Sequence, residues 1–198
     1  QRCGFASGGI FVMDGSKRSQ HGNAYFTGFG AHKRIVFFDT LLKNLQPDEI
    51  EAVLAHELGH FKHGHVRKRL VLMALVSLAA FALLGTLIDA EWFRAGLGLQ
   101  HSSHAGALLL FLLVTPYFSA VLQPLSSYWM RKHEFEADDF AAAQTDAHNL
   151  IHALVKLYEE NAASLTPDRL YSAYHDSHPP APVRISHLAA KLAAQSAP

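Results

Sequence analysis

The stretch Ala55-His56-Glu57-Leu58-Gly59-His60 carries two histidines four positions apart, with a glutamate between them. On an α-helix, side chains four positions apart lie on one face, so the imidazoles of His56 and His60 stand roughly 6 Å apart along the axis. Two neutral imidazoles so placed can bind one zinc ion, and Glu57 can hold a water molecule beside it. A pattern of this length also arises by chance, so two histidines on a buried helix are the alternative.

The residues before this stretch predict the helix that carries it. Pro47, Asp48 and Glu49 supply the proline and the acidic side chains of a first turn. We expect this helix to run on through Gly64 as far as Arg69. Its apolar stripe consists of Ile50, Val53, Leu54 and Leu58.

The composition excludes several classes of protein. The chain of 198 residues has a formal net charge of zero, so nothing in it indicates binding to nucleic acid or another polyanion. Cys3 is the single cysteine, which excludes an intrachain disulfide and a cysteine zinc site. The chain opens on Gln1 without a signal peptide, and we expect it to be the C-terminal piece of a longer protein.

Residues 1–45 predict a small β-sheet. Short apolar runs at 9–13, 22–28 and 34–39 are bounded by turn residues, which is typical of strands. If one of these strands forms an open edge beside the metal, an extended peptide could pair with it through main-chain hydrogen bonds. Asn23 could then hold the backbone of that substrate.

Two uncharged runs in the middle of the chain predict a transmembrane hairpin. Residues 70–88 carry no charge and would form a helix of about 28 Å, close to the thickness of one bilayer core. Residues 105–130 carry no charge either, and 105–125 suffices for a second crossing in which Pro116 and Pro124 kink or end the helix. The alternative is a pair of buried core helices, but a chain of this length could hardly bury two helices that are apolar all round.

The flanks of the hairpin indicate its orientation. Arg94 is the only Lys or Arg of the connection 89–104, whereas basic residues gather at the two outer ends. The positive-inside rule therefore places both outer ends, and the metal-binding helix with them, on the cytosolic face. The basic residues are Arg67, Lys68, Arg69, Arg131 and Lys132. Aromatic residues that fit interfacial belts are Trp92, Phe93, Tyr128 and Trp129.

The segment after the second run carries acids that could complete a metal site. Glu134 and Asp138 are four positions apart and lie on one helical face. One carboxylate could bind the metal while the other holds a ligand histidine through its second ring nitrogen. A hairpin that returns would bring Glu134 back to His56 and His60. Glu136 lies on another face and is the weaker candidate, and a solvated acidic face is the alternative to any metal role.

The C-terminal part combines a rigid loop with helices. Pro179 and Pro180 fix the loop around His178, and a final helix begins near Pro182. The predicted fold is α+β and mainly α, with a small sheet, zincin-type catalytic helices and the inserted hairpin. We divide this one catalytic domain into a sheet and substrate-edge region (1–45), a zinc helix (46–69), a transmembrane hairpin (70–130) and a helical region with the third ligand and a catalytic loop (131–198).

Several stretches together resemble the type I CAAX prenyl endopeptidases, which are integral-membrane zinc metallopeptidases of the gluzincin type. They follow one another in the family's order and span nearly the whole chain, a combination far more specific than His-Glu-x-x-His alone. The family encloses its site in a chamber of seven membrane helices, of which the two predicted here match the last pair. The stretches are Asn23–Phe29, Arg34–Leu42, His56–His60, Glu134–Asp138 and Tyr171–His175 through Arg184.

The resemblance implies a zinc centre of one ion per chain. Its ligands would be His56, His60 and Glu134, with Glu57 as the catalytic base. The implied reaction removes the last three residues that follow a prenylated cysteine. The implied partners are a peptide or protein substrate and the lipid bilayer, with no nucleic acid.

The resemblance also implies roles for residues around the metal. Asp138 would orient a ligand histidine. His178 and Arg184 would contact the scissile carbonyl region, and Asn23 would bind the substrate backbone. These roles come from the family and not from spacing.

Two other functions fit parts of the same pattern. An HtpX-like membrane quality-control protease would use the same zinc chemistry on loosely chosen substrates, but Ser177-His178-Pro179 and the stretch around Asn23 match the CAAX type better. A non-catalytic membrane scaffold with a structural zinc is the other alternative. Glu57 and an acidic third ligand argue against it, because they leave an open position on the metal.

The predicted sidedness can be tested with one engineered cysteine. Ser103 lies in the connection between the two uncharged runs, so Ser103→Cys in a Cys3→Ser background should be labelled by an impermeant maleimide only from the non-cytosolic side of sealed vesicles. The reason is the excess of basic residues at the outer ends of the hairpin. Labelling from the cytosolic side would reverse the predicted topology.

Overall fold

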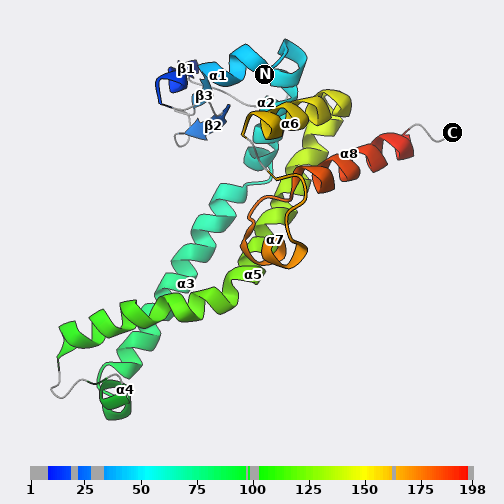
Figure 1. Cartoon of the computed structure of the whole chain (residues 1–198). Helices are drawn as coiled ribbons and strands as arrows, with labels where there is room; N and C mark the ends of the chain where they lie inside the picture. The colour runs from blue at the N-terminus through cyan, green and yellow to red at the C-terminus, as the bar shows by residue number, and fades with distance from the viewer. Residues whose placement is uncertain are drawn as a thin grey trace. The chain divides into compact units, whose positions relative to one another are not determined.

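The computed structural model describes residues 9–18, 22–27, 34–96, 98, 103–161 and 164–195. The chain forms two compact units. The first unit contains residues 1–64 and 127–198, and the second contains residues 65–126. The order of the elements along the chain is shown in Figure 1, and the mainly helical α+β fold with a small sheet confirms the predicted fold class.

A three-stranded sheet lies in the first unit, as predicted. Its strands are β1 (Ile10–Met13), β2 (Ala24–Thr27) and β3 (Arg34–Phe38), and their spatial order is β1-β3-β2. β1 runs parallel to β3, whereas β2 runs antiparallel to it. The central strand buries its apolar side chains, so β1 and β2 are the outer strands among the described residues.

Helix α1 (Asp39–Asn44) leads directly from the sheet into α2 (Pro47–Lys62), the helix that carries His56 and His60. The start of α2 is fixed by a capping box, in which the Glu49 carboxylate accepts a hydrogen bond from the backbone N–H of Gln46 at 2.7 Å. The helix ends earlier than the sequence predicted. Gly64 has a φ of +66°, which interrupts the helix before Arg69.

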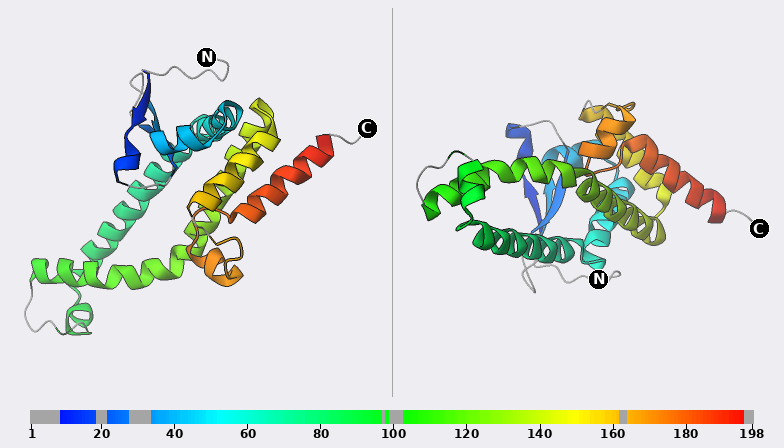
Figure 2. Two further views of the ribbon diagram at one scale, coloured as in Figure 1. Left: turned by 45° about the horizontal axis from the view of Figure 1, so that its top comes forward. Right: turned by 90° about the horizontal axis from the view of Figure 1, so that it is seen from below.

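Three further helices complete the first unit with the C-terminal part of α5 (His104–Gln144). They are α6 (Ala147–Glu160), α7 (Arg169–His175) and α8 (Ala181–Gln195). Figures 1 and 2 show α8 beside α6, and α6 also packs along α2. The core between these helices is formed by Ala52, Ala55, Ala141, Ala147, Leu150, Leu154 and Leu188. A second cluster joins the sheet to α6 through Ile35, Phe37, Leu41, Leu45 and Ala153.

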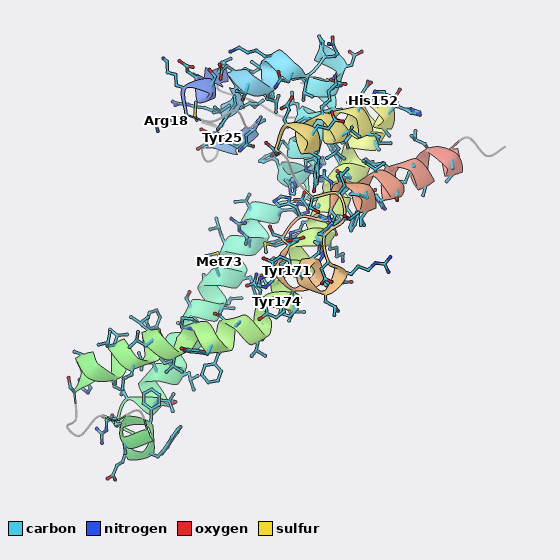
Figure 3. All side chains as sticks on the ribbon, in the orientation of Figure 1. Arg18, Tyr25, Met73, His152, Tyr171 and Tyr174 are labelled. Atoms are coloured by element: carbon cyan, nitrogen blue, oxygen red, sulfur yellow. The ribbon has the colours of Figure 1, made fainter. Side chains whose placement is uncertain are left out.

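The second unit contains α3 (His65–Leu87), α4 (Glu91–Gly96) and the first part of α5. Within the described residues, α3 and α5 are two helices long and apolar enough to cross a membrane. Their apolar side chains point outward, as Met73 illustrates in Figure 3, and Leu78 and Val121 are 68% and 76% exposed. Water would not stabilise so much exposed apolar surface, whereas the hydrocarbon core of a bilayer would.

The prolines of the second run do not end its helix. α5 continues through Pro116 and Pro124, so neither proline ends the helix, while the kink that the sequence predicted as the other outcome stays a prediction. Proline removes a backbone N–H and leaves carbonyl oxygens without their helical partner. The hydroxyl of Thr115 donates to the carbonyl oxygen of Phe111 at 2.7 Å, whereas the carbonyl that Pro116 deprives of its helical donor is that of Leu112.

The capping box of α2 gives a prediction about stability. The Glu49 side chain is buried and also accepts a hydrogen bond from Lys156 Nζ of α6 at 2.7 Å, so one carboxylate fixes both the helix start and its packing on α6. Glu49→Ala should lower the free energy of unfolding by about 1–3 kcal/mol, the usual cost of losing a cap and a charged hydrogen bond. Chemical denaturation in detergent measures this, with exposed Glu51→Ala as the matched control.

The same carboxylate predicts a pH dependence. Burial opposes ionisation of Glu49, but the hydrogen bonds from Lys156 and Gln46 outweigh it and lower its pKa below the ordinary value of 4.5. The unfolded chain therefore binds the proton first as the pH falls. The contribution of Glu49 to stability is fully present above pH 4.5 and is lost as the pH falls through the lowered pKa. The difference in free energy of unfolding between Glu49→Ala and the parent should therefore shrink as the pH falls below 4.5. A difference that stays constant with pH would contradict the stabilising role of the ionised carboxylate.

Candidate metal centre

Three potential metal ligands converge in the first unit. His56 and His60 come from α2 and Glu134 comes from α5, and one ligand atom of each lies within 4.8 Å of the others. The two Nε2 atoms are 3.3 Å apart, and they lie 3.6 Å and 3.2 Å from the Glu134 carboxylate. Two imidazoles and one carboxylate are a donor set that suits a divalent transition metal and leaves a fourth position open.

Close packing of α2 on α5 produces this convergence. A Cβ atom added at Gly59 would lie 2.9 Å from the Cα of Ala137, so only glycine permits this approach. Gly59 lies beside His60 and three positions after His56, while Ala137 lies three positions after Glu134. The contact of the two small residues therefore brings the ligand-bearing turns together.

The Glu134 carboxylate has an unused acceptor that a cation would satisfy. Its Oε2 atom is buried, and among the described residues it makes no hydrogen bond of good geometry, although His178 Nδ1 lies 2.8 Å away. Burial opposes ionisation of this carboxyl group, but His178 and His60 outweigh it and hold its pKa well below the ordinary range. The carboxylate is therefore ionised near neutral pH, as a metal ligand must be.

Asp138 lies behind His56 and fixes its orientation. Asp138 Oδ1 is 2.9 Å from His56 Nδ1, so the other nitrogen of the ring faces the cluster. Burial lowers the pKa of His56 even though Asp138 opposes the effect, which keeps the imidazole neutral and able to bind metal. Asp138 is completely buried, and the hydrogen bonds from Arg184 and His56 outweigh its burial and lower its pKa.

Arg184 neutralises the buried carboxylates. Its Nε and Nη2 atoms donate to the two oxygens of Asp138 at 2.8 Å and 2.6 Å, and its Nη1 atom lies 3.7 Å from Glu134 Oε2. The fork-to-fork geometry uses two of the five N–H donors of the guanidinium. The side chain is buried, and its Nη1 atom lies toward Glu134 and away from the Asp138 pair.

Glu57 and His178 lie at the more accessible side of the cluster. Burial raises the pKa of Glu57, and the nearby Glu134 charge adds to the effect, which makes this carboxylate a stronger base. The ion pair with Glu134 raises the pKa of His178, whose side chain is 68% exposed. A carboxylate and an imidazole that both have raised pKa values therefore flank the same three potential ligands.

The loop around His178 is attached to α5 by two residues that the sequence interpretation missed. Ser127 Oγ donates to the carbonyl oxygen of Tyr174 at 2.9 Å, and Arg131 Nη1 donates to that of Asp176 at 2.8 Å. These bonds satisfy carbonyl groups at the end of α7 and hold the following loop. Sequence patterns carry no signal for Ser127, and Arg131 was interpreted only as a residue that orients the hairpin.

Asn23 lies just before the outer strand β2, which lies beside α2. Its carbonyl oxygen accepts a hydrogen bond from the backbone N–H of Phe38 at 2.9 Å, and its side chain is exposed. Glu136, the weaker candidate for a third ligand, is 3.9 Å from Lys132. The structure thus groups His56, Glu57, His60, Glu134, Asp138, His178 and Arg184, with Asn23 at the sheet.

Comparison with known proteins shows the family to which the chain belongs. A family model described as "Peptidase family M48" matches residues 1–192. The chain belongs to peptidase family M48. Membership of this metallopeptidase family implies a metal, in agreement with the donor set of the cluster.

The chain is also similar to proteins named CAAX prenyl protease 1. It is 37% identical to the Saccharomyces cerevisiae protein over 94% of its own length and 45% of that protein's. It is 42% identical to the Arabidopsis thaliana homolog, over 86% of its own length and 41% of the homolog's. The crystal structure of S. mikatae Ste24p superposes with a TM-score of 0.84 at 36% identity, over 94% of this chain and 47% of that one. The chain thus spans less than half the length of these relatives.

The ligand assignment predicts how mutations change metal binding. Glu134→Ala should lower the metal content after dialysis from near stoichiometric to a small fraction, because two imidazoles bind a divalent ion much more weakly than three ligands do. Elemental analysis by mass spectrometry measures this. Asp139→Ala is the matched control, since that carboxylate also lies on α5 but pairs with His187 at 2.6 Å. Equal metal loss in both variants would contradict the assignment of Glu134.

Proposed function

We propose that this chain carries the catalytic centre of a zinc-dependent membrane endopeptidase that removes the C-terminal tripeptide following a prenylated cysteine. The observation that supports it most is the convergence of His56, His60 and Glu134, with the half-buried Glu57 next to the first ligand. The proposed stoichiometry is one zinc ion per chain. The names of the relatives support the proposed substrate class.

Zinc supplies the Lewis acidity: when bound, it lowers the pKa of a bound water toward neutrality and polarises the scissile carbonyl. The protein's own residues would position the reactants and move the protons. His56 and His60 present their Nε2 atoms, and Glu134 contributes its carboxylate, which leaves room for water and substrate. Asp138 holds His56 in the required orientation through Nδ1.

Glu57 is the proposed general base. Its carboxylate would accept a proton from the attacking water and then deliver it to the nitrogen of the leaving amine. The raised pKa caused by burial suits this role, because a base transfers protons best when its pKa approaches the working pH.

His178 and Arg184 are the proposed anion stabilisers. The raised pKa of His178 keeps a proton on the ring at a higher pH than usual, and the ring is exposed enough to reach a substrate. The Nη1 edge of Arg184 is the part of that guanidinium that Asp138 does not occupy. Both groups would stabilise the negative charge that develops on the carbonyl oxygen during attack. Asn23 would hold the substrate backbone at the sheet.

The membrane setting follows from the two helices of spanning length. We propose a multi-pass protein with this centre on the cytosolic side, where the outer ends of the hairpin carry their basic residues. We also propose that the sheet region, the metal helix, the hairpin and the helical region act as one catalytic domain.

The proposal predicts a separation between metal binding and catalysis. Glu57→Gln keeps the size of the side chain but removes its basicity, so metal content should stay near one ion per chain. Hydrolysis should fall by about 10²–10⁴-fold, the usual effect of losing a positioned general base. The measurement is the mass of a farnesylated C-terminal peptide before and after incubation with the enzyme.

Two outcomes would contradict parts of this proposal. A Glu57→Gln variant that retains full activity would exclude Glu57 as the base. A parent enzyme that degrades unfolded membrane protein as fast as the farnesylated peptide would contradict the CAAX specificity while leaving the hydrolytic mechanism intact.

A further inference from the structure

A groove of about 300 Å³ lies along one face of α3 in the second unit. Its lining consists of Arg67, Lys68, Val71, Leu72 and Leu75. Side chains four positions apart on a helix lie one above the other, so these positions form two adjacent stripes of a single face. Two cations therefore stand at one end of a groove whose other end is apolar.

The positive charge at this end of α3 has no counterpart within the described part of the chain. The side chains of Arg67, Lys68 and the adjacent Arg69 are exposed, and none of them forms an ion pair with a described carboxylate. α3 itself contains no acidic residue. The charge is therefore available to an anion from outside the chain. Elsewhere, lysines that do pair with carboxylates are Lys17, Lys43, Lys132 and Lys191.

The apolar end of the groove restricts the class of anion. Val71, Leu72 and Leu75 are about half exposed, and the groove extends about 12 Å along the helix axis, within the roughly 15 Å of hydrocarbon in one leaflet. A soluble anion would pair with the cations but leave these side chains uncovered. An uncharged prenyl chain would cover them but leave the cations unpaired. A phospholipid of net negative charge satisfies both ends of the groove.

The head group must supply the selectivity of such a site. Every lipid of a bilayer can place an acyl chain against leucine side chains, and lipid chains are as apolar as leucine itself. The guanidinium of Arg67 can hold a phosphate through two parallel hydrogen bonds, and Lys68 adds a compact positive charge. The proposed topology places this end of α3 at the cytosolic leaflet, which carries anionic lipids.

We propose that this groove binds one anionic phospholipid, with the phosphate of its head group at Arg67 and Lys68 and an acyl chain along Val71, Leu72 and Leu75. The proposal goes beyond the peptidase function. It involves no residue of the metal centre, and it holds whether or not the chain hydrolyses peptides. It rests on the position of α3 in a bilayer, which the length and exposed apolar surface of the helix support.

The experiment uses the full chain in phosphatidylcholine nanodiscs with a trace of phosphatidylserine that carries a photoreactive acyl chain. Illumination should cross-link this lipid to a peptide containing Val71, Leu72 or Leu75, which mass spectrometry identifies. Unlabelled phosphatidylserine should suppress the cross-link at a much lower lipid fraction than phosphatidylethanolamine. Arg67→Gln and Lys68→Gln should each raise the phosphatidylserine fraction needed for half suppression about fivefold, the effect of one basic side chain at an anionic surface. Arg67→Lys should retain most of the affinity.

Lys132→Gln is the matched control, because it also removes one cation at an outer end of the hairpin, but Lys132 lies 3.9 Å from Glu136. This variant should leave the suppression unchanged. An equal effect of Lys132→Gln and Arg67→Gln would overturn the proposal, because the lipid would then respond to the overall surface charge.

The competitors give three further outcomes that would overturn the proposal. Equal suppression by phosphatidylserine and phosphatidylethanolamine would show that the head group is not recognised. Suppression by glycerophosphoserine, which has no acyl chains, would indicate a site for a soluble anion. Suppression by a farnesylated peptide would indicate that the groove binds a prenyl chain.

Discussion

The contact between Gly59 and Ala137 is the constraint on which the metal centre depends. The two backbones approach so closely that a Cβ atom on Gly59 would lie 2.9 Å from the Cα of Ala137. Any larger residue at position 59 would separate α2 from α5 and increase the distance from the histidines to Glu134. A metal site tolerates errors of only a few tenths of an ångström in ligand position. Glycine within the helix costs about 1 kcal/mol in helix propensity, and the packing that it permits offsets this.

Electrostatic pairing makes it possible to bury so many ionisable groups around this contact. Glu134 and Asp138 are both nearly inaccessible, and an isolated carboxylate in such surroundings would become protonated. Arg184 lies against both carboxylates, and His56 and His178 supply the remaining nearby donors. These neighbours lower the pKa of both carboxyl groups and therefore keep them ionised. The positive charge of Arg184 also holds the two carboxylates in place.

The sequence could predict the parts of this site that follow from helix geometry. The spacing of His56 and His60, and the spacing of Glu134 and Asp138, each describe one face of one helix, and the structure places both pairs on such faces. The three strands were also predictable from short apolar runs between turns, but the parallel pairing of β1 with β3 was not, since pairing depends on the whole fold. The end of α2 at Lys62 was missed although Gly64 carries the usual signal for it, since glycine readily adopts the positive φ that follows a helix. The hydrogen bonds of Ser127 and Arg131 join segments more than forty positions apart, and no local pattern reports them.

Those long-range bonds explain how a loop can contribute to a precise site. The loop after α7 carries His178, and a free loop would place an exposed histidine over a range of positions. Ser127 and Arg131 lie on consecutive turns of α5, the helix that also provides Glu134 and Asp138. The loop is therefore fixed to the same rigid element as a proposed ligand and its supporting carboxylate. Gly59 fixes α2 to the same helix. The relative positions of the proposed base, the proposed ligands and the proposed anion stabilisers therefore depend on packing against α5.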